Sequence, residues 1–288
     1  MKVTVLKDIL SADDQMAGKN RELLDSHGIT AINIMASPGA GKTSLILKTI
    51  EFLKGKARVG VIEGDIAGSV DADRIGAEGI SVVQINTGGG CHLDAGMVAN
   101  ALASLPLDKI DLLFIENVGN LVCPAAYRLG EHQRVVLTST PEGDDKPQKY
   151  PVMFSEAEVV LINKIDLLSL LDFDPDKFKR TVTGLNPDVR LFELSSKTGE
   201  GFGEWINWLL AEVKLHRKEP ESTTTPKALA AKMRISPKRL RSTLRSEHPR
   251  DDKLKHKPWR IPQPIAKEVE ETYKVKKAAK EANKRLKQ

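Results

Sequence analysis

The stretch Ala36-Ser-Pro-Gly-Ala-Gly-Lys-Thr43 constrains the fold of this chain more than any other feature. The preceding residues 30–35 are typical of a buried strand, and apolar residues recur at helical spacing from Thr43 to Leu53. A glycine-rich loop between a strand and a helix binds phosphate through backbone N–H groups and the positive end of the helix. The chain is therefore predicted to be an α/β protein with a phosphate-binding P-loop.

Each part of this loop has an expected role. Gly39 and Gly41 allow backbone N–H groups to converge on the β-phosphate, Lys42 reaches the β- and γ-phosphates, and the Thr43 hydroxyl binds Mg²⁺. Ala36 stands where such loops usually have their first glycine. The residues predicted to bind the nucleotide here are Gly39, Ala40, Gly41, Lys42, Thr43 and Ser44.

A second motif predicts which base is bound. Asn163-Lys-Ile-Asp166 follows a continuous apolar run, as expected at the carboxyl end of a central parallel strand. The Asp166 carboxylate accepts from guanine N1–H and the exocyclic amine, a donor pair that adenine lacks. Lys164 is expected to lie along the base, and the backbone of Ser196 and Lys197 to meet guanine O6. Together the two motifs predict a GTP site that includes Asn163, Lys164, Asp166, Ser196 and Lys197.

Strand and helix patterns alternate through the first 218 residues, which predicts a doubly wound, mostly parallel sheet. The expected strands are residues 30–35, 57–62, 80–85, 111–115, 134–138, 158–162 and 189–194, and the expected helices are residues 12–26, 43–53, 93–104, 175–184 and 202–215.

Charge divides the chain. Residues 219–288 carry 20 Lys and Arg against 9 Asp and Glu, whereas the residues before them carry 24 against 30. The breaker-rich segment 219–226 predicts a linker between a nucleotide-binding domain (1–218) and a basic helical extension (227–288). Neither a signal peptide nor a membrane-spanning apolar run is recognisable, and two cysteines supply no disulfide framework. A cytoplasmic protein without a membrane partner is expected.

Carboxylates at two further strand ends are candidates for Mg²⁺ binding and catalysis. Asp65 in Glu63-Gly-Asp65 and Glu116 in Glu116-Asn-Val-Gly119 are assigned to the metal, and both join Lys42 as catalytic candidates. The Gly119 N–H is expected near the γ-phosphate. Each motif alone is also compatible with an ordinary acidic loop. The segment from Asp71 to Arg74 fits a switch or a solvated helix start equally well.

The residue that positions the attacking water stays undecided among three candidates, which are Asp65, Asp71 and Glu142.

The two cysteines have an unusual placement. Cys91-His92 follows a run of three glycines, and Cys123 lies in a second loop after a strand. Thiolate and imidazole groups suit Zn²⁺ or Ni²⁺, and three ligands leave one coordination position open. Structural cysteines explain the spacing equally well, so the residues alone leave both interpretations open.

From Ile32 to about Leu215 the chain resembles the HypB family of SIMIBI-class P-loop GTPases, which serve nickel-hydrogenase maturation. The resemblance rests on the P-loop, the 63–65, 71–75, 84–88 and 163–167 segments, and three longer blocks. The two most specific are Cys91-His-Leu-Asp-Ala95 and Glu116-Asn-Val-Gly-Asn-Leu-Val-Cys-Pro124; the third spans Glu142 to Phe154.

The resemblance implies that Cys91, His92 and Cys123 bind nickel or zinc at the interface of a GTP-dependent homodimer. It implies that nickel passes, with a HypA-like chaperone, to the hydrogenase large-subunit precursor. Since Cys123 lies seven residues after Glu116, GTP hydrolysis is expected to reshape the metal site and release the ion. Two alternatives are a related GTPase serving another enzyme such as urease, and a regulator in which GTP switches a nucleic-acid-binding tail.

Two features depart from that family. Residues 1–28 contain no cysteine and a single histidine, His27, so nickel binding must rest on the later site. The basic extension is the other departure. Helices are expected from Pro226 to Arg234 and from Pro237 to about Ser246, similar to small helix-turn-helix modules. Nucleic acid, an acidic partner and plain solvation are all compatible with its charge.

Overall fold

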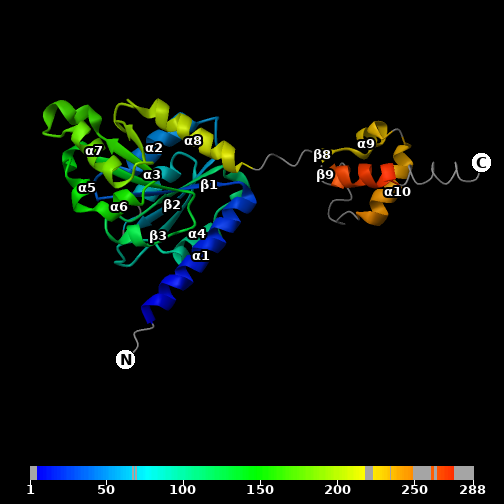
Figure 1. Cartoon of the computed structure of the whole chain (residues 1–288), viewed down its shortest axis with the longest axis horizontal. Coiled ribbons are helices and arrows are strands. Elements are labelled where there is room, and N and C mark those ends of the chain that lie inside the picture. The colour runs from blue at the N-terminus through cyan, green and yellow to red at the C-terminus, as the bar shows by residue number, and fades with distance from the viewer. Residues whose placement is uncertain are drawn as a thin grey trace, which may run out of the picture. The chain divides into compact units, whose positions relative to one another are not determined.

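The computed structural model describes two compact units, Met1–Arg217 and Lys218–Gln288. Figure 1 labels their elements. None of the described helices is long and apolar enough to cross a membrane. Within the predicted linker, residues 219–222 lie outside the described part of the chain. The described residues are 5–66, 68, 70–217, 223–233, 235–248, 261–262 and 265–275, with side chains described from residue 12 onward.

The first unit is built on a seven-stranded sheet in the order β3-β2-β4-β1-β5-β6-β7. Every adjacent pair is parallel, which confirms the predicted doubly wound sheet. The five inner strands are buried almost throughout, as expected when helices cover both faces. The strands are β1 (Thr30–Ala36), β2 (Val59–Asp65), β3 (Ser81–Asn86), β4 (Leu112–Glu116), β5 (Gln133–Ser139), β6 (Val159–Asn163) and β7 (Arg190–Glu193).

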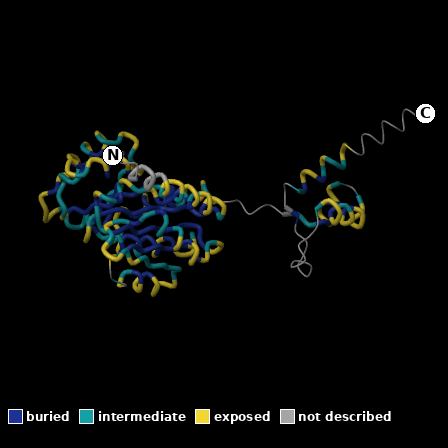
Figure 2. The backbone as a smooth tube through the Cα atoms, turned by 90° about the horizontal axis from the view of Figure 1, so that it is seen from below, coloured by how far each residue is buried: buried dark blue, intermediate teal, exposed yellow. Residues whose placement is uncertain are grey.

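Helices cover both faces of this sheet (Figure 1), and Figure 2 shows the buried strands between them. On one face, α2 (Lys42–Leu53) and α8 (Phe202–His216) pack on alternate residues of β1 such as Ile32 and Ile34, and α3 (Val70–Gly76) packs beside β2 and β3. The other face is covered by α1 (Val5–His27), α4 (Ala95–Leu102), α6 (Pro151–Ser155) and α7 (Pro175–Leu185).

Several element boundaries differ from the sequence predictions. Helix α4 begins at Ala95 rather than Leu93, because the Asp94 carboxylate accepts from Met97 N–H and caps the helix. Strand β2 continues to Asp65, since its pairing with β3 extends to Asn86. Short elements were not predicted, namely α5 (Lys146–Lys149), α6 and the 3₁₀ helices η1 (Leu107–Lys109), η2 (Cys123–Ala126), η3 (Thr140–Glu142) and η4 (Ile165–Leu170).

The described part of the second unit includes the helices α9 (Pro226–Lys232) and α10 (Pro237–Glu247). Strands β8 (Thr223–Thr224) and β9 (Ile261–Pro262) pair antiparallel, and residues 265–275 are also helical. Ser236 caps α10 with Pro237 at its first position, and Leu240 and Leu244 are buried, as the sequence predicted. The core of this unit consists of Leu229, Ala230, Leu240, Leu244, Ile261, Ala266 and Val269.

Candidate functional site

The P-loop joins β1 to α2 at the carboxyl edge of the sheet. Gly39 and Gly41 have φ values of 77° and 101°, in the left-handed region that favours glycine. At Gly41 the space is also closed, because an added Cβ would lie 2.7 Å from Asn163 Nδ2. Asn163 Nδ2 donates to Ala40 O over 3.0 Å, so the end of β6 supports the loop directly.

The residues predicted to bind the base lie together around one cavity of about 250 Å³. Ser195 Oγ donates to Asp166 Oδ1 over 2.6 Å, which orients that carboxylate. Asn163 Oδ1 accepts from the backbone N–H of Ser196, and Lys164 Nζ donates to Gly39 O. Asn163 therefore bridges the P-loop and the Ser196 loop. The cavity is lined by Gly41, Ser44, Asn163, Lys164, Asp166, Leu167, Ser196 and Lys197.

Two buried glutamates lie side by side behind the P-loop. Glu63 and Glu116 occupy paired positions of β2 and β4, and each is 3% exposed. Thr43 Oγ1 donates to Glu116 Oε1 over 2.9 Å. The second oxygen of each glutamate has no hydrogen-bond partner among the described residues. A hydroxyl with converging carboxylate oxygens is a donor set that fits Mg²⁺.

The same burial changes the protonation of both glutamates. Burial raises the pKa of Glu116 to about 7, opposed by the charge of Lys42 and the Thr43 hydrogen bond. Burial and the neighbouring Glu116 raise the pKa of Glu63 to about 8. A nearby cation would stabilise the ionised forms of both carboxyl groups and so lower their raised pKa values.

Glu63 lies beside Glu116 in the structure, whereas the sequence predicted Asp65, from the same motif, as the metal-binding candidate. Asp65 instead accepts from the N–H groups of Ile66 and Gly68, at the start of the segment before α3. A signal was present in the sequence: Ile62-Glu63 and Ile115-Glu116 are the same apolar–acidic pair, each after a buried apolar run.

Three further residues singled out in the sequence are Gly119, Asp71 and Glu142. Gly119 lies against the P-loop, where an added Cβ would be 3.0 Å from Pro38 N. Asp71 lies in α3 and pairs with Arg74 over 3.1 Å. Glu142 Oε2 accepts from both the N–H and the hydroxyl of Ser139, forming a capping box for η3. The other carboxylate oxygen of Glu142, Oε1, lies 3.6 Å from Lys146 Nζ.

The structure brings Cys91, His92 and Cys123 together, with all potential ligand atoms within 4.8 Å of one another. Cys91 Sγ donates to Cys123 Sγ over 2.8 Å and lies 3.6 Å from His92 Nδ1. The hydrogen bond to Cys123 raises the pKa of the Cys91 thiol. The Tyr127 ring stacks on His92 with centroids 3.9 Å apart. Two sulfur atoms and an imidazole at the surface form a compact site for a soft or borderline cation.

Asn117 connects the phosphate end of β4 to this cluster. It follows Glu116 directly, is 1% exposed, and accepts from the backbone N–H of Leu93 over 3.1 Å. Leu93 in turn follows His92, while the chain beyond Asn117 leads to Cys123. The Asn117 amide also donates to Asn33 Oδ1 on β1. One buried side chain thus ties both halves of the cysteine-histidine cluster to β1 and β4.

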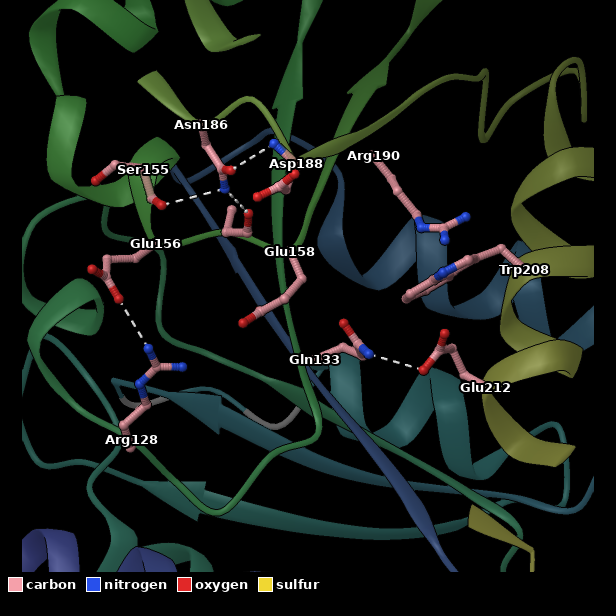
Figure 3. Close-up of a pocket in the computed structure, with 11 residues that line it drawn as sticks. Arg128, Gln133, Ser155, Glu156, Glu158, Asn186, Asp188, Arg190, Trp208 and Glu212 are labelled. Atoms are coloured by element: carbon pink, nitrogen blue, oxygen red, sulfur yellow. Dashed lines mark hydrogen bonds and ion pairs between the residues drawn. The ribbon is translucent and has the colours of Figure 1, made fainter. Parts of the chain in front are cut away.

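A separate cavity of about 390 Å³ lies at the opposite, amino edge of the sheet (Figure 3). Gln133 and Arg190 begin β5 and β7 there. Some of its polar groups pair with one another: Gln133 Nε2 donates to Glu212 Oε2, and Arg128 pairs with Glu156, as the dashed lines in Figure 3 show. None of the residues predicted to bind nucleotide or metal lines this cavity.

The parallel sheet, the P-loop and the cavity beside Asp166 define a P-loop nucleotide-binding protein. A family model described as the CobW/HypB/UreG nucleotide-binding domain matches residues 30–193. The hydrogenase maturation factor HypB of Azotobacter vinelandii is 50% identical over 203 residues, covering 70% of this chain and 67% of the relative. A probable HypB of Methanocaldococcus jannaschii is 47% identical, covering 73% and 95%.

Comparison with solved structures points to the same family as the sequence comparisons. HypB of Archaeoglobus fulgidus superposes with a TM-score of 0.67 at 41% identity, covering 70% of this chain and 99% of that one. HypB of Helicobacter pylori in complex with nickel gives a TM-score of 0.69 at 38% identity, covering 73% and 99%. The chain belongs to the CobW/HypB/UreG family, in its HypB branch. The family model ends at residue 193, before the basic second unit.

Proposed function

We propose that this protein is a cytoplasmic GTPase that delivers nickel to the large subunit of a nickel-iron hydrogenase. The observation that carries the proposal is the cluster of Cys91, His92 and Cys123, tied through Asn117 to the phosphate end of β4. A reducing compartment suits this site, because thiolates rather than a disulfide bind the cation.

The nucleotide half of the mechanism uses the carboxyl edge. Lys42 contacts the β- and γ-phosphates, and Asp166 and the Ser196 loop select guanine. Thr43 and Glu116 hold Mg²⁺, with Glu63 and Asp65 as further carboxylates near it. Bound Mg²⁺ neutralises charge on the phosphates. Lys42, Asp65 and Glu116 remain the proposed catalytic residues, and the Gly119 N–H is proposed to respond to the γ-phosphate because Gly119 packs against Pro38 of the P-loop.

The metal half follows from the position of Asn117. Movement of residues 116–119 when the γ-phosphate is lost shifts Cys123 along the chain and His92 through the hydrogen bond to Leu93. Three ligands leave a coordination position for a second protomer. We propose that GTP favours a homodimer with a complete metal site, and that hydrolysis weakens the site. No step of this cycle requires residues 227–288.

Cargo and partners are proposed from the relatives. One solved HypB binds nickel, and the relatives are named as hydrogenase maturation factors. Nickel is then the cargo, received with a HypA-like chaperone and passed to the hydrogenase large-subunit precursor, while Zn²⁺ competes for the same ligands. A urease client is a second candidate, because the 41% identical relative of Helicobacter pylori is named a hydrogenase/urease maturation factor.

The test is a Ni²⁺ titration of the full chain with GDP and with a non-hydrolysable GTP analogue, while mass is followed by light scattering. We expect tighter Ni²⁺ binding and a doubled mass with the analogue. Cys123→Ala is expected to lose at least about tenfold in Ni²⁺ affinity, since removal of a ligand costs no less than removal of a supporting group.

Ala126→Ser is the matched control, because Ala126 is an exposed non-ligand on the same turn as Cys123. It should bind Ni²⁺ as the wild type does. Identical Ni²⁺ affinity and mass in both nucleotide states would refute the coupling, and a wild-type affinity in Cys123→Ala would refute the site.

A further inference from the structure

The second unit presents a basic helix face that the proposed nickel cycle does not use. Lys238, Arg241 and Arg245 are exposed on α10 and follow one another at helical spacings of three and four. Leu240 and Leu244, on the opposite side of the same helix, are buried in the core of the unit. The helix is therefore fixed to its unit by one face, and its other face meets solvent.

These three basic side chains have no ion-pair partner among the described residues, unlike their neighbours. Lys232 pairs with Glu270 over 2.6 Å, and the Arg239 guanidinium lies 5.6 Å from the centre of the Tyr273 ring. The acidic side chains of the described part of this unit are at the last turn of α10 and on the helix of residues 265–275. The face formed by Lys238, Arg241 and Arg245, here called the α10 face, thus carries unneutralised positive charge.

We propose that the α10 face binds double-stranded DNA, with α10 in the major groove. Helices α9 and α10 follow one another with four residues of sequence between them, a spacing typical of the helix-turn-helix, in which the second helix is the one that enters the groove. With its side chains an α-helix is about 10–12 Å across, close to the roughly 12 Å width of that groove. Lys227, exposed in the first turn of α9, is placed to contact the phosphate backbone.

The composition of the α10 face favours DNA over a protein partner. Beyond Pro237, the exposed residues of α10 are Lys238, Arg239, Arg241, Ser242, Arg245, Ser246 and Glu247, and none of them is an apolar or aromatic anchor. Protein interfaces depend on such buried anchors, whereas protein–DNA interfaces are polar and strongly positive. Ser242 and the three basic residues supply the donors that phosphates and base edges accept.

The same face fits RNA poorly. The major groove of an RNA duplex is too deep and narrow for a helix, and single strands are bound by stacking on exposed aromatic rings. Tyr273, the aromatic residue in the described part of this unit, is covered by Arg239. Among the nucleic acids, the described residues of this unit therefore favour duplex DNA.

The test is fluorescence anisotropy of the full chain with a mixed-sequence duplex of about two helical turns, titrated from about 50 to about 200 mM salt. We expect binding that weakens steeply with salt. Arg241→Gln/Arg245→Gln should bind at least about tenfold more weakly and lower the salt slope by up to about 2, because each lost phosphate contact removes about 0.9.

Lys267→Gln/Lys274→Gln is the matched control, since it removes the same charge from exposed positions of the helix of residues 265–275. It should bind the duplex nearly as the wild type does. Absence of duplex binding at about 50 mM salt, an equal loss in both double variants, or stronger competition by single-stranded RNA than by duplex DNA would each overturn the proposal. GTP and Ni²⁺ binding should be unchanged in both variants, which separates this result from the fate of the nickel cycle.

Discussion

The carboxyl and amino edges of the sheet differ in how their glutamate side chains are hydrogen-bonded. At the carboxyl edge, Glu63 and Glu116 each keep one buried oxygen without a partner among the described residues, and their pKa values are raised by burial. At the amino edge, Glu212 and Glu156 accept from Gln133 and Arg128 in the cavity of Figure 3. Arg134 Nε is an unpaired atom there, although it lies 3.5 Å from Glu131 Oε1.

The contrast favours the carboxyl edge, rather than the amino edge, as the place where a ligand binds. An unpaired buried carboxylate costs free energy, and a cation bound beside it would offset that cost. In the amino-edge cavity, by contrast, Glu212 and Glu156 already have partners in Gln133 and Arg128. Substitutions should therefore change nucleotide and metal chemistry at the carboxyl edge, and only stability at the amino edge.

The largest effect is expected from Asp166→Asn. The amide of asparagine presents a donor toward the guanine amine, so GTP affinity should fall by at least about 100-fold. Xanthosine triphosphate carries a carbonyl at that position and should bind more tightly to the variant than to the wild type. Competition binding with both nucleotides, measured by calorimetry, gives the two constants.

Ser195→Ala tests the support of that carboxylate, because Ser195 Oγ donates to Asp166 Oδ1. It should weaken GTP binding by less than the Asp166 change and leave xanthosine triphosphate binding low. Equal GTP affinity in wild type and Asp166→Asn would show that Asp166 does not recognise the base. It would also contradict the proposed difference between the carboxyl edge and the amino edge of the sheet.

The carboxyl edge was predictable because its chemistry is encoded in contiguous residues. Gly39 to Thr43 and Asn163 to Asp166 carry their roles in short motifs, and continuous apolar runs located the strands around them. Glu63 was not predicted because its importance depends on register, which places it beside Glu116 only after β2 and β4 pair. The link through Asn117 to Leu93 N–H was equally invisible, since it joins segments distant in sequence.

The amino edge was not predicted at all, because it arises from single residues on five or more separate segments. Gln133, Asn186 and Glu212 meet only through the fold. In the second unit, local signals sufficed for α10: Ser236, Pro237 and the spacing of Leu240 and Leu244 fixed its start and its buried side. Strands β8 and β9 contain two residues each and leave no periodic signal to read.

An effect of intermediate size, on the pH dependence of the free energy of unfolding, is expected from His132, which lies just before β5 on the amino edge. Its side chain is 1% exposed, its Nδ1 accepts from Ala31 N–H, and its Nε2 lies 2.9 Å from Asp25 Oδ1. Burial lowers its pKa from 6.5 to about 4, so the unfolded chain takes up the proton at higher pH than the folded one. The free energy of unfolding should therefore fall by about 2 kcal/mol between about pH 7 and pH 5.

His132→Gln removes this titration and should flatten the dependence on pH, although it lowers stability near neutrality through lost hydrogen bonds. Urea unfolding followed across the pH range measures both quantities. The control is His27→Gln, which removes a histidine at the end of α1 and should keep the wild-type dependence on pH. If the free energy of unfolding of His132→Gln fell with pH as steeply as that of the wild type, protonation of another group would cause the loss of stability in acid.

The smallest effect is expected from Arg128→Ala, within the cavity of Figure 3. Arg128 Nη2 pairs with Glu156 Oε2 over 2.9 Å, but both side chains are nearly half exposed, at 48% and 46%. Solvent screening limits such a pair to about 1 kcal/mol or less. Glu156 also keeps a second cation, because Arg134 Nη1 lies 3.5 Å away. Urea unfolding should show this small loss, while GTP and Ni²⁺ affinities stay at wild-type values. A change in either affinity would mean that the amino edge communicates with the nucleotide site through β5 and β6, and the contrast between the two edges would then fail.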